Sequence, residues 1–439
     1  MHRSLRVALI GFSALLLLAP VSAQATGAST QDDEYTVPAL EVVSDDPVNA
    51  QSQQSPPETL EEREELIPEE SPEEVRERAE LAERLEIPAE IGEEGPLSAA
   101  ASVEPTDDVT DCQANDQARE YEGLAVGHLV WCSERGVVVV VKDCVPGNPN
   151  ECVERGAAEF LIRTVGYAGV NYREIEFVSS LSNFELVGDV ARVLQAPLTM
   201  AMDCTSVGQG SSCDAGSTNG REDTVENWMA APTTYFYFSS PLPPPSVDNP
   251  DFVSHYSFTS RIISGSDNLD YASNGFRCDS ASYLIRNDQQ GGCVFDLVIE
   301  TFDELSTDDP AVWEAAVHIF TAQFEPENTL PRKTSKSIPG SPESGQPLTR
   351  NYHDTALYQR TQAIQAEYCA ALFGRDYSQG GTYQCDEYPF AHTYQSLGSG
   401  GDFSLRVITA RDNESAGGRW SAWLLAQRIL DSDAFYVLV

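Results

Sequence analysis

The chain has 439 residues, with 27 lysines and arginines against 69 aspartates and glutamates, and its formal net charge is −42. This charge argues against a nucleic-acid partner for the chain as a whole, because phosphate contacts need lysine and arginine. About half of the excess, however, lies between Asp32 and Asp108, and the last hundred residues are only mildly acidic and contain several arginines. We therefore interpret the acidity as a solvating segment rather than as a property of a binding site.

The N-terminus has the pattern of a secretory signal peptide. Arg3 and Arg6 precede an apolar run, Val7–Leu18, and small residues at 21–25 offer a cleavage site. The run is shorter than the ~20 residues that a membrane-spanning helix needs. We therefore expect residues 1–25 to be removed, and the mature chain to be secreted and to have no membrane contact.

Ten cysteines follow this segment, and none of them forms the paired C-x-x-C spacings of a zinc site. An even number of cysteines in an exported chain predicts disulfide bonds. Proximity in the sequence suggests the pairs Cys204–Cys213, Cys278–Cys293 and Cys369–Cys385. The remaining four can pair in more than one way: Cys112, Cys132, Cys144 and Cys152.

Residues 26–108 are rich in glutamate, proline and serine and contain no aromatic residue after Tyr35. Such a composition cannot bury enough apolar surface to offset the entropy lost on ordering. We expect a disordered acidic linker or a propeptide, with one marginal, solvated helix in Pro72–Leu85.

Residues 109–304 are predicted to form a β-rich, disulfide-containing domain. Short β-branched or aromatic segments, separated by glycine, asparagine and proline, are typical of an antiparallel sandwich. Strands are expected at Val137–Lys142, Glu159–Arg163, Tyr172–Val178, Pro197–Met202, Thr234–Phe238, Ser254–Ile263, Ala281–Arg286 and Cys293–Glu300.

Residues 305–439 change to a mixed helical and extended pattern, so the fold class of the whole chain is α+β. Asp309 can cap a helix whose apolar stripe is Trp313, Val317, Phe320 and Phe324. The elements that follow are a helix at Asp354–Phe373, an extended corner at residues 385–390, a strand at Asp402–Thr409, a helix at Ser415–Leu430 and a strand at Ala434–Val439. We expect Leu357, Ile364, Tyr368 and Leu372 to face inward from the second helix.

Three polar features of this last region could form a site. Asp386 and Glu387 are adjacent on the extended corner, where they point to opposite faces, and Pro389 keeps the corner rigid. Residues 411–414 form a polar turn before a helix that starts near Gly417. His318 lies off the apolar stripe of its helix.

An acidic extended segment, a strand and a helix start make a ββα arrangement that can hold one divalent metal, and oxygen ligands favour Mg²⁺ or Mn²⁺. Taken alone, each of these features is more often structural, since acidic pairs in turns are commonly solvated and single helical histidines commonly pack.

Their combination resembles the NucA/NucB deoxyribonuclease domain of exported bacterial nucleases. The resemblance covers about 130 residues and is most specific in CDEYPFAHT at Cys385–Thr393, followed by DNESAGG at Asp412–Gly418. Further matching segments are AVWEAAVHIFTAQ at Ala311–Gln323, PLTR at Pro347–Arg350, Ser404–Ile408 and RILDSDAFYV at Arg428–Val437.

The resemblance implies a ββα-metal-like nuclease domain in which an acidic residue replaces the usual base histidine. On the matching positions, Asp386 is the general base, and Glu387 is a metal ligand or the group that orients the site. Asn413 positions the metal or the phosphate. The implied cofactor is Mg²⁺ or Mn²⁺.

Other positions carry weaker expectations. His318 is a nearby ligand or phosphate contact, and Arg350 and Arg419 are candidates for neutralising phosphate. The chain departs from the family pattern in two places. His392 stands where we expect a small serine, which makes it either a second base or a neutral replacement, and we favour the latter. Ala422 stands where compact members carry asparagine, which puts a ligand there in doubt.

The function expected from these observations is a secreted, metal-dependent endonuclease that hydrolyses DNA with little sequence specificity. DNA is then the partner, and no obligate protein partner is evident. Two alternatives remain open: a catalytically inactive β-rich binding or adhesion protein, and a nuclease toxin delivered to competitors.

Overall fold

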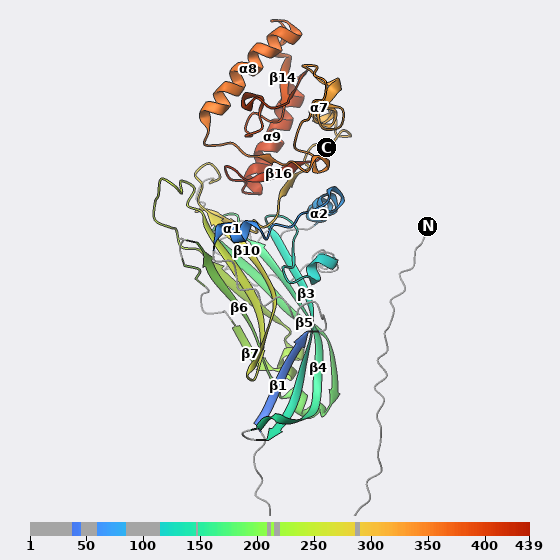
Figure 1. The fold of residues 1–439 in the computed structure, drawn as a ribbon, viewed down its shortest axis with the longest axis vertical. Coiled ribbons are helices and arrows are strands. Elements are labelled where there is room, and N and C mark those ends of the chain that lie inside the picture. Colours follow the sequence, from blue (N-terminus) through green and yellow to red (C-terminus); the bar gives the residue numbers. More distant parts are fainter. Residues whose placement is uncertain are drawn as a thin grey trace, which may run out of the picture.

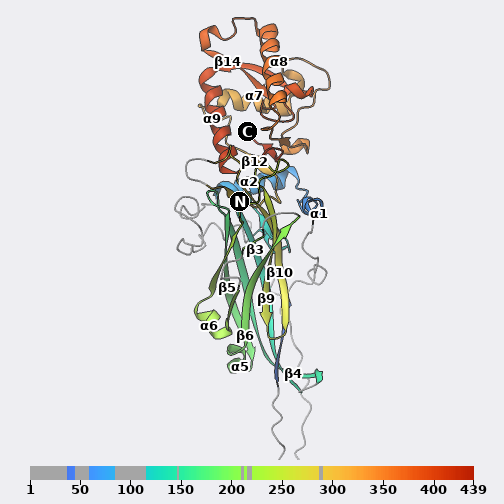
Figure 2. The same ribbon diagram turned by 90° about the vertical axis from the view of Figure 1, so that its left-hand side faces the viewer.

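A computed structural model shows the arrangement of most of the chain. The residues that it describes are 37–44, 59–84, 115–145, 148–208, 212–214, 220–285 and 290–439. The expected signal peptide and Cys112 lie outside these ranges. Figures 1 and 2 show an elongated β-sandwich with the C-terminal helices and short strands gathered at one of its ends.

The sandwich consists of two antiparallel sheets, as the strand spacing predicts. The first sheet has the order β1-β3-β4-β5-β8, with β2 paired to β3, and the second has the order β11-β10-β9-β6-β7. The bounds are β1 Val37–Ser44, β2 Leu124–Ala125, β3 Val130–Val145, β4 Asn148–Ala168, β5 Glu174–Gly188, β6 Pro197–Val207, β7 Gly220–Thr224, β8 Thr233–Ser239, β9 Ser254–Ser264, β10 Asp267–Asp279 and β11 Gly292–Val294. Short helices lie at η3 Asp116–Arg119, α5 Val190–Leu194 and α6 Val225–Ala230.

Aromatic side chains fill the space between the two sheets. Trp131, Phe177 and Phe258 are fully buried there, and the Trp131 and Phe258 rings meet edge to face at 4.9 Å. Such contacts add to the burial of large apolar areas. The sandwich therefore has a core of its own.

Several strand predictions in this region are wrong, among them Cys293–Glu300, which is a strand only at its two ends. Strand β10 has no predicted counterpart, because polar residues interrupt its alternation at Asp267–Asp270 and Ser273–Asn274. The segment expected as a strand from Ala281 is instead a turn, in which the Asp279 carboxylate accepts a hydrogen bond from the Ala281 N–H at 3.1 Å.

Parts of the acidic N-terminal segment are ordered and lie against the junction of the two domains (Figure 1). Helix α1 spans Leu60–Glu64 and helix α2 spans Pro72–Arg84. Arg63 forms a buried ion pair with Asp296 of the sandwich. Arg78 donates to the backbone carbonyls of Val126 and Ile299. These partners lie far away in the sequence, so the composition of residues 26–108 cannot reveal them.

The C-terminal domain contains a small sheet, a hairpin and three longer helices. The sheet has the order β12-β16-β13, with β12 Glu300–Phe302, β13 Leu348–Thr349 and β16 Ala434–Val437. The hairpin pairs β14 Tyr383–Tyr388 with β15 Ser404–Thr409. The helices are α7 Trp313–Phe324, α8 Thr355–Phe373 and α9 Ala410–Ala426, with short 3₁₀ turns η4 Pro326–Asn328, η5 Pro342–Ser344, η6 Gln379–Gly381 and η7 Leu397–Ser399. Strand β12 precedes the expected boundary at residue 305 and nevertheless pairs in parallel with β16.

The inward faces of two helices differ from the predicted ones. Trp313, Phe320 and Phe324 of α7 are largely exposed, whereas Ala315 and Ile319 are buried. Small residues let α7 approach its neighbours closely, so the buried face is not its most apolar one.

The prediction for α8 is confirmed only at Leu357, which is buried together with Thr361 and Cys369. Tyr368 and Leu372, which we expected to face inward, are exposed, and Ile364 is only half-buried.

The structure forms all three of the expected disulfides, Cys204–Cys213, Cys278–Cys293 and Cys369–Cys385. It also links Cys144 to Cys152. The pairs Cys144–Cys152 and Cys278–Cys293 join residues that are directly opposite on neighbouring strands. Cys132 is disulfide-bonded as well.

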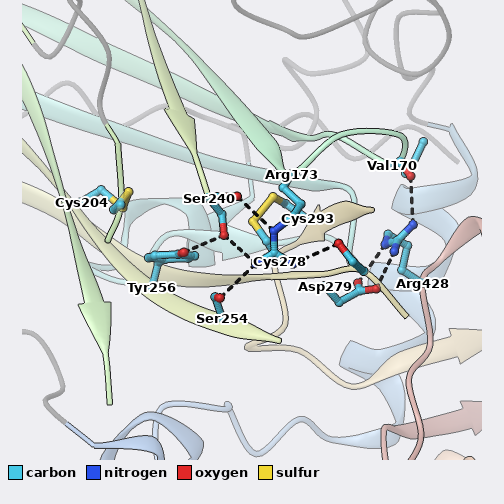
Figure 3. Close-up of a disulfide and its surroundings, with 12 residues drawn as sticks. Val170, Arg173, Cys204, Ser240, Ser254, Tyr256, Cys278, Asp279, Cys293 and Arg428 are labelled. Atoms are coloured by element: carbon cyan, nitrogen blue, oxygen red, sulfur yellow. Dashed lines mark hydrogen bonds and ion pairs between the residues drawn. A yellow bond between two sulfur atoms is a disulfide. The ribbon is translucent and has the colours of Figure 1, made fainter. Parts of the chain in front are cut away.

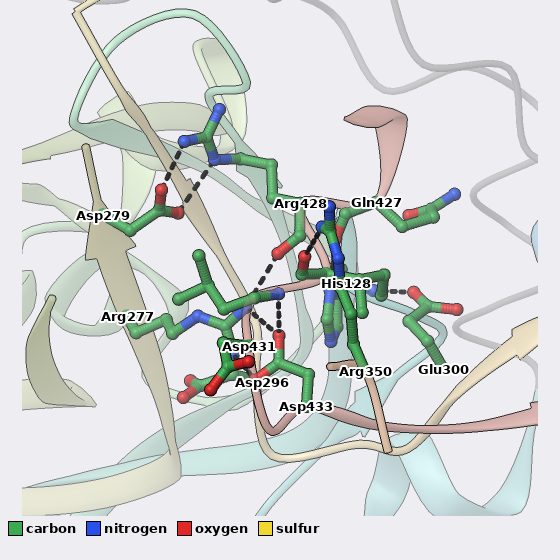
Figure 4. A network of polar contacts seen from close by, with 12 residues as sticks. His128, Arg277, Asp279, Asp296, Glu300, Arg350, Gln427, Arg428, Asp431 and Asp433 are labelled. Atoms are coloured by element: carbon green, nitrogen blue, oxygen red, sulfur yellow. Dashed lines mark hydrogen bonds and ion pairs between the residues drawn. The ribbon is translucent and has the colours of Figure 1, made fainter. Parts of the chain in front are cut away.

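Charged side chains connect the sandwich to the C-terminal domain. Arg428, just after α9, forms a fully buried ion pair with Asp279, which follows Cys278 (Figure 3). Arg277 pairs with Asp433 in the same region (Figure 4). This interface fixes the position of α9, which carries part of the site described next.

Candidate active site

A pocket of about 180 Å³ lies between α7, α9 and the end of β14. Its polar lining residues are Asp386, Glu387, His392 and Asn413, and its apolar walls come mainly from α7 and α9. Two larger cavities, of about 340 and 460 Å³, contain neither Asp386 nor Glu387. The smaller pocket is the candidate active site, because the polar groups that can do chemistry converge there.

Asp386 is held by a buried histidine. Nδ1 of His318 lies 2.6 Å from Oδ2 of Asp386, and Nε2 of His318 lies 2.7 Å from Oγ of Ser404. Both ring nitrogens of His318 are therefore used, and its side chain is almost completely buried. The Asp386 side chain keeps about 16% exposure, so its carboxylate can still meet a ligand in the pocket.

Glu387 alternates with Asp386 along β14, so its carboxylate reaches a partner on α8, while the residue also lines the pocket. Gln365 of α8 donates hydrogen bonds to the Glu387 carboxylate and to the Cys385 carbonyl, the latter at 2.8 Å. The Cys369–Cys385 disulfide ties the same strand to α8. Burial and, secondarily, the neighbouring Asp386 charge raise the pKa of Glu387 to about 8.

This pKa predicts how the stability of the metal-free protein depends on pH. Native Glu387 retains its proton up to about pH 8, whereas in the unfolded chain it ionises near its ordinary value of 4.5. The native state thus binds more protons between these values, and its stability falls as the pH rises. We expect Glu387→Gln to raise the melting temperature in EDTA at pH 8 and to leave it nearly unchanged at pH 4.

Glu367→Gln is the matched control for this melting experiment, since Glu367 is an exposed glutamate on α8. It should match the wild type at both pH values. An equal gain from the two variants at pH 8 would show that net charge, and not the Glu387 site, causes the change.

Asn413 lies in the first turns of α9 and not in a turn before it. Helix α9 begins at Ala410, so the predicted start near Gly417 is wrong. Asn413 Nδ2 donates to Oε1 of Gln384 on β14 at 2.7 Å. This hydrogen bond orients the amide and leaves its oxygen available to the pocket.

The early start of α9 has a tertiary cause. The Asp412 carboxylate accepts hydrogen bonds from the backbone N–H groups of Glu314 and Ala315 at the start of α7, both at 2.9 Å. In return, Glu314 accepts one from the Thr409 N–H at 2.6 Å. Each helix therefore supplies an acidic cap to the N-terminus of the other, where negative charge is stabilising.

The two arginines expected at the phosphate are engaged elsewhere. Arg350 is buried, donates to the Ile429 carbonyl and lies over the Tyr283 ring at 4.9 Å. Arg419 pairs with Asp309 and donates to the Glu304 carbonyl at 2.8 Å. Neither lines the pocket.

Arg406 is placed differently from these two. It lies directly opposite Asp386 in the β14–β15 hairpin, so the two side chains share one face. It is partly exposed, and no hydrogen bond or ion pair joins it to another residue in the described part of the chain.

The donor set of the pocket fits a hard divalent cation. Asp386, Glu387 and Asn413 offer carboxyl and amide oxygens, and no arginine or lysine lines the pocket. Within the described ranges, no group of three or more histidine, cysteine or acidic side chains could hold a metal alone. A bound ion would therefore need oxygens from water and substrate as well, as is usual for Mg²⁺.

Several supporting residues have no distinctive signal in the sequence. Gln365, Gln384 and Ser404 orient Glu387, Asn413 and His318, respectively. Their roles become visible only in the folded domain, although Ser404 begins one of the segments that resemble the family. Asp412 belongs to a recognisable DN motif, but the pattern suggests a local turn and not a cap for a distant helix.

Residues 342–438 match the family model described as Deoxyribonuclease NucA/NucB. The match includes Asp386, Glu387, His392 and Asn413, whereas His318 precedes it. Comparison with curated proteins and with solved structures finds no match.

Proposed function

We propose that the chain is an exported endonuclease that hydrolyses DNA with one divalent ion, on the basis of the match of residues 342–438 to the NucA/NucB deoxyribonuclease model. This match supports a DNA-hydrolysing nuclease at the level of the family. The observation that supports the finer proposal best is the pocket in which Asp386, held by His318, lies beside Glu387 and Asn413.

Asp386 is the proposed general base. Its Oδ2 faces His318, so its other oxygen can take a proton from the attacking water. His318 holds the carboxylate in this orientation, and Ser404 holds His318. General base catalysis of this kind contributes roughly 10²- to 10⁴-fold to the rate.

Glu387 and Asn413 are the residues that would hold the metal. When bound, a divalent ion stabilises the negative charge that develops on the phosphate oxygens. Ionised Glu387 is the form that binds a cation, so metal binding and loss of the Glu387 proton are coupled. Mg²⁺ or Mn²⁺ suits this oxygen-rich set.

Arg406 is a candidate cation for the phosphate, because it shares a hairpin face with Asp386 and has no acidic partner among the described residues, although it does not line the pocket. Contacts to phosphate carry no sequence information. Cleavage with little sequence preference is therefore the expected behaviour.

Export is supported by the disulfides of the described chain, which form in oxidising compartments. None of the helices that the structure describes is long and apolar enough to cross a membrane. The proposed signal peptide and its cleavage remain expectations from the sequence.

A plasmid-nicking assay on the purified mature protein tests the function directly. Supercoiled DNA should be nicked in Mg²⁺ or Mn²⁺, and EDTA should abolish the reaction. Nicking that persists in EDTA would contradict metal dependence, and an absence of nicking with every divalent metal would favour an inactive binding protein.

A further inference from the structure

His392 lies on the wall of the candidate active site and is held in one orientation. Its imidazole stacks on the Tyr358 ring of α8, with centroids 4.3 Å apart and planes inclined by 15°. Its ring is hydrogen-bonded to the Asn351 carbonyl, and the Asn351 N–H donates to the His392 carbonyl at 2.8 Å. Tyr358 therefore holds one face of the His392 ring, and Asn351 holds one of its edges.

The remaining surface of this ring is open. His392 is an exposed residue, although Tyr358 covers one face and Asn351 occupies one edge. Among the described residues, no ring contact or hydrogen bond involves the other face or the other edge, which leaves them for a ligand. Partial burial and the nearby Arg350 charge lower the pKa of His392, which favours the neutral, apolar form of the ring.

The other histidines in the described part of the chain are engaged differently. His128 and His353 have oxygen partners, and both nitrogens of His318 are used. His255 lies beside Asp296. His392 is thus the one of these histidines that both lines the pocket and stacks on an aromatic ring.

We propose that the stacked Tyr358 and His392 rings form a platform for one nucleobase next to the scissile phosphate, so that the preferred substrate is DNA with an unpaired base at this position. The proposal rests on the nuclease function assigned to the pocket. In a duplex, both faces of each base are covered by its neighbours. Only an unstacked base can lie on the ring of His392, and stacking of this kind is worth about 1–3 kcal/mol per base.

Two His392 variants separate stacking from other roles of the imidazole. For a single-stranded oligonucleotide, His392→Ala should raise KM about fivefold or more, and should weaken binding in EDTA by a similar factor. His392→Phe keeps an aromatic face but no nitrogen, so its KM and binding should stay within about twofold of the wild type. Cleavage of the matching duplex should change little in both variants.

His353→Ala is the matched control, because His353 also packs against aromatic rings but lies outside the pocket. It should behave like the wild type. A wild-type KM in His392→Ala would overturn the proposal. Equal losses in His392→Ala and His392→Phe, seen in kcat rather than KM, would also overturn it, since they would show that a ring nitrogen acts in the reaction.

The binding measurement keeps this test independent of catalysis. Fluorescence anisotropy of a labelled single strand in EDTA reports the platform even where no DNA is cut. If the wild type binds the single strand through His392 but does not nick DNA, the proposed nuclease function is contradicted and the proposed base platform is supported. If the protein nicks DNA, but the His392 substitutions change neither KM nor binding of the single strand, only the proposed base platform is contradicted.

Discussion

Replacing Asp386 by asparagine is expected to lower the rate of DNA cleavage about 10²- to 10⁴-fold, because the amide cannot accept the proton of the attacking water. The substitution keeps the size of the side chain, and its amide oxygen can still accept the hydrogen bond from His318 Nδ1. The melting temperature should therefore remain close to that of the wild type. The measurement is plasmid nicking at saturating metal, paired with a thermal melt of each protein.

Asp308→Asn is the control for the loss of one negative charge in the same domain. Asp308 is exposed and lies outside the pocket, so this variant should cleave DNA at the wild-type rate. Full activity in Asp386→Asn would exclude Asp386 as the base. Inactivity accompanied by a large fall in melting temperature would instead show that Asp386 mainly supports the fold.

The sequence predicts features of this domain that depend on local chemistry. The alternation of strand faces places Asp386 and Glu387 on opposite sides of β14, and the structure gives them separate partners on α7 and α8. The Cys369–Cys385 link is also predictable, because its two cysteines are close in the sequence.

Features that depend on distant partners could not be predicted in this way. Residues 411–414 have the composition of a turn, and they are helical because Asp412 and Glu314 cap each other's helices. Arg350 and Arg419 have the right charge for a phosphate contact. Their positions depend on Ile429 and Asp309, whose proximity only the folded chain reveals.

The structure of the N-terminal acidic segment also depends on distant partners, which its sequence does not reveal. Its net charge predicts disorder, yet Val75, Ala79 and Leu81 of α2 are buried. A short apolar stripe is too small to fold alone, and it becomes stable when another part of the chain supplies the opposing surface. Composition averages over the segment and so cannot detect the stripe.

Of the substitutions considered, Arg428→Ala is expected to lower the free energy of unfolding most, by about 3–5 kcal/mol, because it removes one partner of a buried ion pair. Arg428 is 1% exposed and Asp279 is 0% exposed. The guanidinium donates to both carboxylate oxygens, at 2.9 and 2.5 Å, and to the Val170 carbonyl at 3.0 Å. Truncation would leave the Asp279 carboxylate buried without its cation. Chemical denaturation of the full chain measures the effect.

Arg419→Ala provides the matched comparison within α9. Arg419 is also paired with an aspartate, but about one third of each side chain in that pair is exposed. Exposed pairs contribute about 0–1 kcal/mol, so this variant should unfold near the wild-type midpoint. It should also keep the wild-type nicking rate if Arg419 makes no phosphate contact. Equal destabilisation by the two substitutions would contradict the special role assigned to the buried pair.

A double variant, Asp279→Leu with Arg428→Leu, tests whether the unpaired Asp279 carboxylate causes the loss of stability in Arg428→Ala. Removing both charges avoids an unpaired buried carboxylate, so part of the stability should return relative to Arg428→Ala. Helix α9 ends shortly before Arg428 and carries Asn413 and Trp420 of the pocket, so we expect a loosened interface to disturb the site. Nicking by Arg428→Ala should therefore fail at a lower temperature than nicking by the double variant. That result would show that the sandwich supports the nuclease pocket through this ion pair.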